Sequence, residues 1–386
     1  MSSAYLLMFV VGASAALYIT FGYPVLLSCL ARYRGSPVHR KLELKTVSVI
    51  VAVHNGEWWI HQKLRSVLGL RYPRDLMQIL IVSDGSTDRT DEYVSEFASD
   101  GIELLRIERA GKAMAVNAAL ERARGEVLFF TDIRQPLDPD CLSSLVATLG
   151  DPIVGAAAGH VLFRDKDAQK AAHMGMYWRY EKWVRRNLSR LDSMLAGSCV
   201  YAMRRDLAKP MPPGLLLDDS YLPLGAFFKG YRFVLDDNAV VYEYPTPLRV
   251  EFRRKVRTLA GIYQIAMVLP EILTAANRMR FHFVSYQLGR VILPFALLLA
   301  AAGSVGLPGL WGSMALAIQA GLYCTALIDP FVPVRSSLKR FTSFICAVFV
   351  LMAASLCAVA IFFRPAQSFW KETTLQKGIQ SEESQR

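Results

Sequence analysis

The sequence predicts an α/β domain with a mostly parallel, doubly wound sheet, flanked by transmembrane helices. Two observations support this fold class. Short apolar runs alternate with helical patterns between residues 46 and 135, which is typical of a parallel sheet with crossover helices. In addition, 53% of the 386 residues are apolar, and the excess lies in four long runs outside that region. We therefore expect one water-soluble domain and a membrane part.

The first strand is expected over 47–53 (VSVIVAV), because an uninterrupted apolar run of this length is typical of a strand buried on both faces. Residues 58–68 have the apolar spacing of a helix, which ends near Gly69. A second strand is expected at 79–82, and a helix of mixed polarity follows at about 91–99.

Residues 104–107 predict a third, short strand, and 112–124 predict a helix with small apolar residues on its inner side. The run VLFF at 127–130 is the fourth strand, and it leads directly into Thr131 and Asp132. Each strand thus ends in a short polar loop. These loops are Asn55-Gly56-Glu57, Asp84-Gly85, Gly111-Lys112 and Thr131-Asp132. A parallel sheet brings such loops together in one crevice, where ligands bind.

Two of these loops carry groups suited to a phosphorylated ligand. Asp132, at the end of a rigid strand, is placed to hold a metal ion or a sugar hydroxyl. Lys112 is a compact cation suited to phosphate. The alternatives are that Asp84 and Asp132 are turn or cap residues and that Lys112 is a solvated residue. A cation at a helix start opposes the helix dipole, which favours a functional Lys112. No Walker or G-x-G-x-x-G motif supports an ATPase or a dinucleotide enzyme.

Four runs are long enough to span a bilayer, which requires about 20 apolar residues each. They are residues 5–30, 284–303, 310–328 and 341–363. The first lacks a preceding basic segment and is followed by Arg32 and Arg34, so we expect a retained anchor rather than a signal peptide.

Basic residues beside these runs indicate the orientation. They are Arg32, Arg34, Arg40, Lys41, Arg335, Lys339 and Arg340. The positive-inside rule then predicts a multi-pass protein of the inner or plasma membrane with a cytoplasmic catalytic domain. The net charge of +11 is concentrated beside the membrane and no nucleic-acid-binding motif is present. We therefore expect anionic lipid and phosphorylated substrates as partners, and no nucleic acid.

The motifs VSVIVAVHNGE, IVSDGSTD, RAGKAMAVNAAL and VLFFTD occur in this order. Together they resemble the nucleotide-binding half of the family 2 glycosyltransferases, whose GT-A fold is shared by cellulose, chitin and hyaluronan synthases. The resemblance covers about 46–269. It implies a GT-A domain at 46–247, divided into a nucleotide-sugar half (46–135) and an acceptor half (136–247). The other expected segments are a transmembrane helix at 1–31, basic interfacial helices at 248–282, three transmembrane helices at 283–363 and a polar tail at 364–386.

The resemblance also implies a set of nucleotide-sugar-binding residues. They are Ala52, Val53, His54, Glu57, Asp84, Lys112, Asp132, Arg254 and Arg257. In this set Asp84 contacts the base, Lys112 the diphosphate, and Asp132 the metal and phosphate region. The family usually has Asp-x-Asp, whereas this chain has Asp132-Ile133-Arg134. A divalent cofactor (Mg²⁺ or Mn²⁺) on Asp132 is still expected, but it loses one oxygen ligand and Arg134 adds a positive charge.

Asp218 and Asp219 follow an apolar run and precede a helical pattern, so they suit a helix N-terminus and need be no more than its cap. The stretch resembles the family's acidic motif, which implies that Asp219 is the catalytic base and that Asp218 assists it. A base there accepts the proton of the attacking acceptor hydroxyl, and a single displacement inverts the anomeric configuration.

Polymerising family members carry Gln-x-x-Arg-Trp where this chain has Arg254 to Thr258. Arg257 retains the phosphate-binding role, but Thr258 cannot stack on a sugar. The sequence therefore predicts a hexosyltransferase that adds one sugar, from a UDP-sugar, to a lipid-linked or glycan acceptor of a cell-surface polysaccharide pathway with partner proteins. The alternatives are a processive polysaccharide synthase and, in another class, a catalytically silent nucleotide-binding membrane scaffold.

Overall fold

The computed structural model describes residues 2–163, 168–244, 248–333 and 336–370. These form two compact units. The sheet unit comprises Arg34–Arg164 and Arg185–Tyr244 with the segment from Trp370, and the helical unit comprises Met1–Tyr33, Asp165–Val184 and Pro245–Phe369. The predicted tail from 371 onward and the basic residue Arg335 lie outside the described residues.

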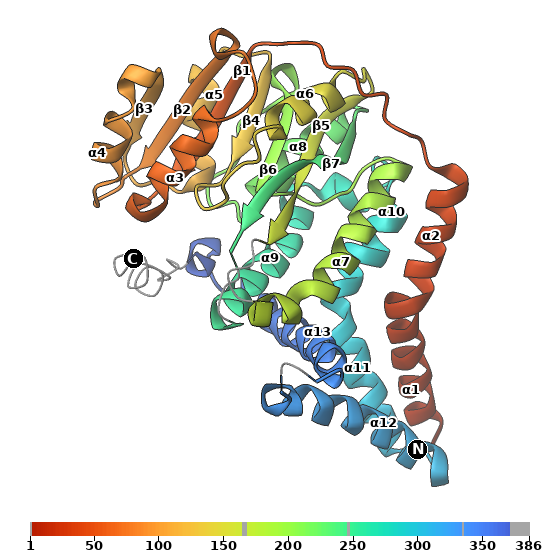
Figure 1. Cartoon of the computed structure of the whole chain (residues 1–386). Helices are drawn as coiled ribbons and strands as arrows, with labels where there is room; N and C mark the ends of the chain where they lie inside the picture. The colour runs from red at the N-terminus through yellow and green to blue at the C-terminus, as the bar shows by residue number, and fades with distance from the viewer. Residues whose placement is uncertain (1, 164–167, 245–247, 334–335, 371–386) are drawn as a thin grey trace. The chain divides into compact units, whose positions relative to one another are not determined.

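The sheet unit is built on a seven-stranded sheet of order β3-β2-β1-β4-β6-β5-β7 (Figure 1). Its strands are β1 (Val47–Val53), β2 (Met77–Asp84), β3 (Ile102–Ile107), β4 (Val127–Thr131), β5 (Val154–Phe163), β6 (Val200–Arg204) and β7 (Arg232–Glu243). The first four strands pair in parallel, β6 is antiparallel to both β4 and β5, and β5 and β7 are parallel. The predicted mostly parallel sheet is confirmed.

The helices of the sheet unit follow the sequence pattern closely. They are α3 (Glu57–Leu68), α4 (Thr90–Ser95), α5 (Lys112–Arg122), α6 (Cys141–Leu149) and α8 (Asp218–Phe228). The helix expected over 91–99 is shorter than predicted. It gives way to a 3₁₀ turn at Ala98–Asp100, which ends at Gly101 with φ of +75°, a conformation that glycine adopts without a steric penalty.

The alternation of side chains along the strands gives the sheet two different faces. On one face Val49, Val51 and Phe129 pack in a core with residues of α3 and α6. On the other face Ile50 and Phe130 meet Val116 of α5, and Ile50 lies opposite Phe130 in the register of β1 and β4. The second face is the one on which the polar pocket described below is built.

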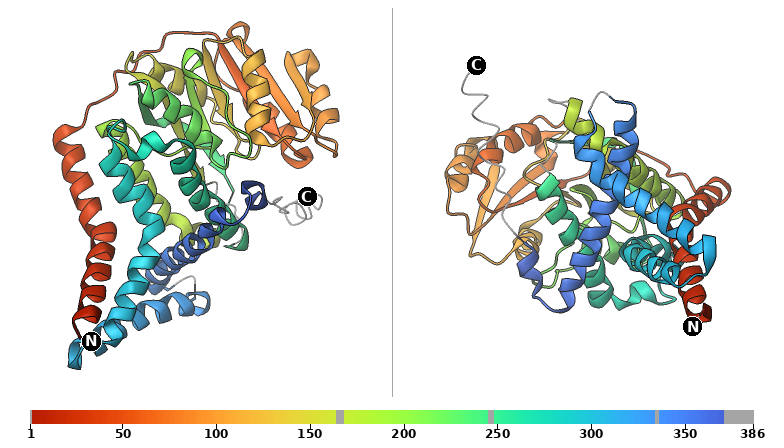
Figure 2. Two further views of the ribbon diagram at one scale, coloured as in Figure 1. Left: turned by 180° about the vertical axis from the view of Figure 1, so that it is seen from behind. Right: turned by 90° about the horizontal axis from the view of Figure 1, so that it is seen from below.

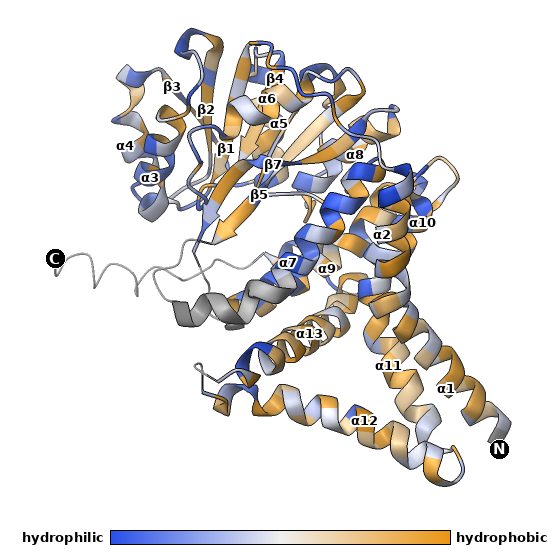
Figure 3. Ribbon diagram, turned by 45° about the vertical axis from the view of Figure 1, so that its right-hand side comes forward, coloured by the Kyte–Doolittle hydropathy of each residue, from blue (hydrophilic) through white to orange (hydrophobic). Residues whose placement is uncertain are grey.

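Among the described residues, four helices are long and apolar enough to cross a membrane, and they span Ser3–Arg34, Arg280–Val305, Gly309–Phe331 and Leu338–Phe362. They correspond to the four predicted runs. Their main segments are α1 (Ser2–Leu17), α2 (Tyr23–Arg34), α11 (Gly289–Val305), α12 (Gly309–Ile328) and α13 (Leu338–Ala358). Figure 3 shows that these segments are predominantly hydrophobic. The remaining helices are α7 (Ala168–Leu191), which continues into the sheet unit, α9 (Leu248–Val268) and α10 (Arg280–His282).

Small residues bring α1 and α11 into close contact, and Figure 2 shows the two helices side by side. A side chain at Gly12 would clash with the backbone of Ala296 and Ala300, and one at Gly303 would clash with the backbone of Phe9. Close backbone approach through small residues is a common way for helices to associate in lipid. The first apolar helix is therefore packed as part of the bundle.

Candidate active site

A small pocket lies at the edge of the sheet where β1 and β4 end. Its polar lining comes from Lys112 at the start of α5, Asp132 after β4, and Asp218 and Asp219 at the start of α8. Five predicted site residues line it: Ala52, Lys112, Asp132, Asp218 and Asp219. Lys112 and Asp132 therefore meet at one edge, as the parallel topology predicts, and Asp218 and Asp219 join them from the start of α8.

Lys112 connects two of the carboxylates. Its Nζ atom donates a hydrogen bond to Oδ1 of Asp132 at 2.7 Å and lies 2.9 Å from Oδ2 of Asp218. Burial opposes the charged form of this lysine, but Asp132, Asp218 and Asp219 outweigh burial and raise its pKa above the usual value. Lys112 is therefore a permanent cation, as a diphosphate-binding residue must be.

Asp219 is a carboxyl group of the pocket with a raised pKa. Burial, together with the negative charges of Asp218 and Asp132, raises its pKa from 3.8 to about 6, although Lys112 and Arg185 act in the opposite direction. A carboxylate with such a pKa holds a proton more readily than an ordinary aspartate, which is the property a general base requires. Asp218, in contrast, is tied to Lys112.

Gly197 fixes the position of Asp219 from the opposite side. A Cβ atom at Gly197 would lie 2.2 Å from Cγ of Asp219 and 2.5 Å from its backbone carbonyl carbon. The amide of Gly197 also donates to the hydroxyl of Ser220 at 2.9 Å. The backbone at Gly197 therefore packs directly against the start of α8.

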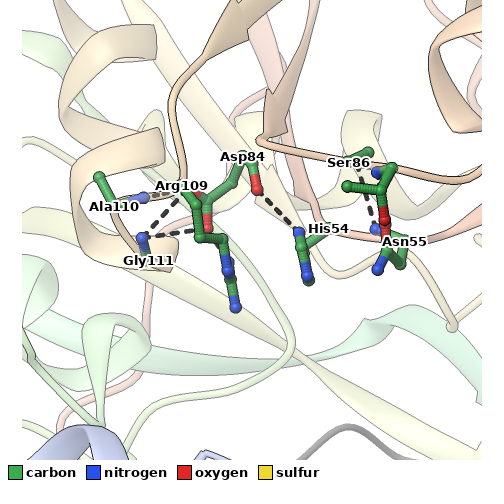
Figure 4. A network of polar contacts seen from close by, with 8 residues as sticks. His54, Asn55, Asp84, Ser86, Arg109, Ala110 and Gly111 are labelled. Carbon is green, nitrogen blue, oxygen red and sulfur yellow. Dashed lines mark hydrogen bonds and ion pairs between the residues drawn. The ribbon is translucent and has the colours of Figure 1, made fainter.

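Asp84 organises the loop before Lys112 (Figure 4). Its carboxylate accepts hydrogen bonds from the backbone amides of Ala110 at 2.7 Å and Gly111 at 3.0 Å, and it pairs with the guanidinium of Arg109. Gly111 has φ of +91°. The carboxylate is 2–3% exposed, so Asp84 holds the loop that precedes Lys112, and its direct contact with a base stays a prediction.

The loop after β1 is joined to the loop after β2. The Nδ1 atom of His54 lies 2.8 Å from the carbonyl oxygen of Asp84, and because a carbonyl only accepts, Nδ1 is the donor. The amide of Glu57 donates to Asp88 at 3.0 Å, and Glu57 accepts from the amide of Arg89 at 3.2 Å. Val53 packs in the hydrophobic core, which leaves only its backbone to line a nucleotide site.

Arg134 is turned towards Glu243 at the end of β7, with Nη2 3.1 Å from Oε1. Its charge is therefore balanced, at least in part, within the sheet unit. Among the described residues no group of three or more His, Cys, Asp or Glu side chains could hold a metal ion. Mg²⁺ is often bound by one carboxylate together with substrate phosphates. Asp132, with a side chain 37% exposed, fits that single role.

Arg254 and Arg257 lie on α9 of the helical unit. Within α9, Arg254 lies 3.6 Å from Glu251, and the hydroxyl of Thr258 donates to the carbonyl oxygen of Arg254 at 2.9 Å. Binding of donor phosphates by these two arginines stays a prediction.

The sequence analysis did not identify two residues close to the pocket. Tyr201 of β6 lies opposite Phe130 of β4, stacks on it at 4.6 Å and lines the pocket. Within the described part of the chain its buried hydroxyl has no hydrogen-bond partner. Lys63 is buried on the inner face of α3. The sequence did contain a signal for Lys63, which lies on the same helix face as Ile60, Leu64 and Val67. A cation on an apolar helix face needs polar partners, so a lysine at this position indicates a specific contact.

This architecture is similar to that of glycosyltransferases of GT-A fold. Residues 48–209 match the sequence profile of the family described as Glycosyl transferase family 2. This stretch of the chain is therefore similar to the family 2 glycosyltransferases.

Individual relatives agree with this class. The chain is 33% identical over 242 residues to "Probable glycosyltransferase YdaM" of Bacillus subtilis (strain 168), covering 57% of this chain and 56% of that protein. It is 29% identical over 129 residues to a poly-beta-1,6-N-acetyl-D-glucosamine synthase of Staphylococcus epidermidis, covering 33% and 31%. The chain thus matches between about a third and just over half of the length of these relatives.

One solved structure resembles most of the chain. It is the mannosyltransferase PcManGT from Pyrobaculum calidifontis in complex with GDP-Man and Mn²⁺, with a TM-score of 0.69 at 24% identity, covering 90% of this chain and 99% of that chain. This similarity confirms the predicted GT-A fold.

Proposed function

We propose that this protein is an inverting membrane glycosyltransferase. It transfers a sugar from a nucleotide-sugar, which we expect to be a UDP-sugar, to a hydroxyl of a lipid-linked or glycan acceptor in cell-surface polysaccharide or glycolipid biosynthesis. The observation that carries the proposal is the placement of Lys112 between Asp132 and Asp218, beside an Asp219 with a pKa of about 6. A phosphate-binding cation and a proton acceptor are the two groups that the reaction needs.

In the proposed mechanism Lys112 neutralises the diphosphate of the donor. Asp219 accepts the proton of the acceptor hydroxyl as its oxygen forms a bond to the anomeric carbon. The bond from that carbon to the diphosphate oxygen breaks on the opposite face, and the nucleoside diphosphate leaves with the bonding electrons. A divalent ion on Asp132 would supply additional neutralisation of the diphosphate charge.

The membrane part supports an acceptor of lipid character. Four helices are able to span a bilayer, and the basic helix α9 packs against α13 within the helical unit. A basic amphipathic helix favours a membrane surface with anionic lipid. We place the protein in the inner or plasma membrane, with the catalytic domain on the cytoplasmic side.

A processive polysaccharide synthase is a second candidate, favoured by the similarity to the staphylococcal synthase. Against it, the Thr258 hydroxyl bonds back to its own helix, and threonine offers no ring on which a sugar of a growing polymer could stack. Product length distinguishes the two: a single addition gives one glycosylated acceptor, whereas a synthase gives long polymer.

The proposal is tested by release of nucleoside diphosphate from UDP-, GDP- and dTDP-sugars, using detergent-purified full-length protein with Mn²⁺, Mg²⁺ or EDTA. We expect turnover with one donor, lost in Asp219→Asn and Asp132→Ala. Asp206→Asn, which changes an exposed carboxylate outside the pocket, should retain activity. Nucleotide binding without turnover under any condition, with acceptor lipids supplied, would favour the silent scaffold instead.

A further inference from the structure

Lys63 is a buried lysine that makes no ion pair within the described part of the chain. It lies on α3 with 1% of its surface exposed. Its Nζ atom donates hydrogen bonds to the hydroxyl of Thr131 at 2.9 Å and to the carbonyl oxygen of Gln135. These two acceptors flank the segment 132–134, so a single ammonium group connects the beginning and the end of the loop that carries Asp132.

This placement is unfavourable for the lysine itself. Burial lowers its pKa to about 8, although Cys199, Asp132 and Cys141 act in the opposite direction. Its neighbours on the same helix face, Ile60, Leu64 and Val67, are apolar, and an apolar side chain at position 63 would avoid the desolvation of a charge. The hydrogen bonds to the loop are therefore the interaction that a lysine makes at position 63 and that an apolar side chain could not make.

The loop has further attachments on its other sides. The amide of Asp132 donates to the carbonyl oxygen of Cys199 at 3.0 Å, and Arg134 is paired with Glu243. Neither attachment joins the two ends of the loop to each other, which is what Lys63 does. The Asp-x-Asp pattern has two carboxylates, whereas this loop has one. Binding at this loop therefore depends strongly on the orientation of Asp132, which the conformation of the loop determines.

We propose that Lys63 is a positioning residue for donor binding: from behind the sheet it fixes the 131–135 loop so that Asp132 faces the donor diphosphate beside Lys112. This inference rests on the proposed function. Lys63 thus contributes to the affinity for the nucleotide-sugar although it lies outside the pocket. It does so by fixing the geometry of the loop and not by contacting the ligand.

The test compares Lys63→Met, which keeps the length of the side chain and removes the ammonium, with Leu64→Ala. Leu64 is the adjacent residue, is fully buried and packs in the core of the sheet unit, so its truncation reports general destabilisation. For full-length protein in detergent, two quantities are measured: hydrogen exchange of peptides covering 130–136, and the affinity and KM for the donor identified in the turnover panel.

We expect Lys63→Met to accelerate exchange in the 130–136 peptides and to weaken donor affinity about tenfold, the usual lower range for a supporting residue behind a ligand-binding carboxylate. The effect should appear in KM more than in kcat. Leu64→Ala should lower the melting temperature while its folded fraction binds the donor within about twofold of wild type.

Unchanged exchange in the loop would overturn the inference, as would faster exchange with unchanged donor affinity or an equal affinity loss in Leu64→Ala. The proposed function is tested separately by wild-type turnover. If wild type neither binds nor turns over any nucleotide-sugar while the loop still loosens in Lys63→Met, the proposed function fails, and the role in donor binding fails with it.

Discussion

The pH dependence of Asp218→Asn provides a direct test of the role of Asp219. Asp219 has a pKa of about 6 because it is buried and because Asp218 carries a like charge beside it. A general base acts in its ionised form, and kcat/KM reports the ionisation of the free enzyme, so kcat/KM for the donor should fall as pH decreases through 6. With a pKa of 6, about one tenth of the free enzyme is competent at pH 5, so kcat/KM there should be about tenfold below its plateau.

Replacing Asp218 by asparagine removes the like charge. The pKa of Asp219 should then fall by about one unit, a usual size for a neighbouring charge. At pH 5 Asp219 would then be ionised in roughly half of the variant molecules. The kcat/KM of the variant at pH 5 should therefore lie only about twofold below its own plateau. The plateau itself is expected to be lower than that of wild type, because Asp218 also holds Lys112.

Lys112→Gln should shift the profile in the opposite direction, since Lys112 lowers the pKa of Asp219. The assay is release of nucleoside diphosphate at donor concentrations well below KM, which gives kcat/KM, followed between about pH 5 and 8, with each variant normalised to its own plateau. Asp206→Asn serves as the control and should keep the wild-type profile. The decrease in activity at low pH should therefore have a different midpoint in Asp218→Asn and in Lys112→Gln than in wild type. An unchanged midpoint in both variants would refute the assignment of Asp219 as the titrating base.

Three further substitutions test other parts of the site. Gly197→Ala should reduce kcat by about 10²-fold in circular-dichroism-verified folded protein, because the new methyl group displaces Asp219; near-normal kcat would contradict the close packing. Tyr201→Phe should leave the melting temperature unchanged or raise it, since the hydroxyl has no partner among the described residues and an unpaired buried polar group costs about 1–3 kcal/mol; a clear decrease would indicate a bound partner. Glu243→Gln should destabilise the protein by about 2 kcal/mol in denaturant melts, because Arg134 loses its charged acceptor; unchanged stability would mean that the pair contributes little.

The parts of the fold that the sequence predicted well are those with a local signal. The run VSVIVAV coincides with β1, and α5 begins at Lys112 as expected. Asp132 follows β4 directly. Parallel pairing of four strands then places the polar loops at one edge whatever their exact lengths, so the proximity of Lys112 and Asp132 follows from topology.

Features that depend on distant partners were not predicted. β5 contains three consecutive alanines and two glycines, which have low intrinsic strand preference, and it becomes a strand because β6 and β7 flank it. The antiparallel direction of β6 has no signal in its own residues. For the same reason Tyr201 reaches the pocket only through its pairing with β4, and the Arg134 partner, Glu243, is 109 positions away in the chain.

The bridge from Lys112 to Asp132 and Asp218 also links donor occupancy to proton uptake. In the empty pocket one ammonium group compensates two carboxylates directly and lowers the proton affinity of a third, Asp219. An anionic ligand that draws Lys112 towards its own oxygens withdraws that compensation and adds negative charge, so the proton affinity of Asp219 rises as the ligand arrives. By reciprocity, the donor binds more tightly as pH decreases through the titration range of Asp219. Binding of the donor and the increase in the pKa of Asp219 are then thermodynamically coupled.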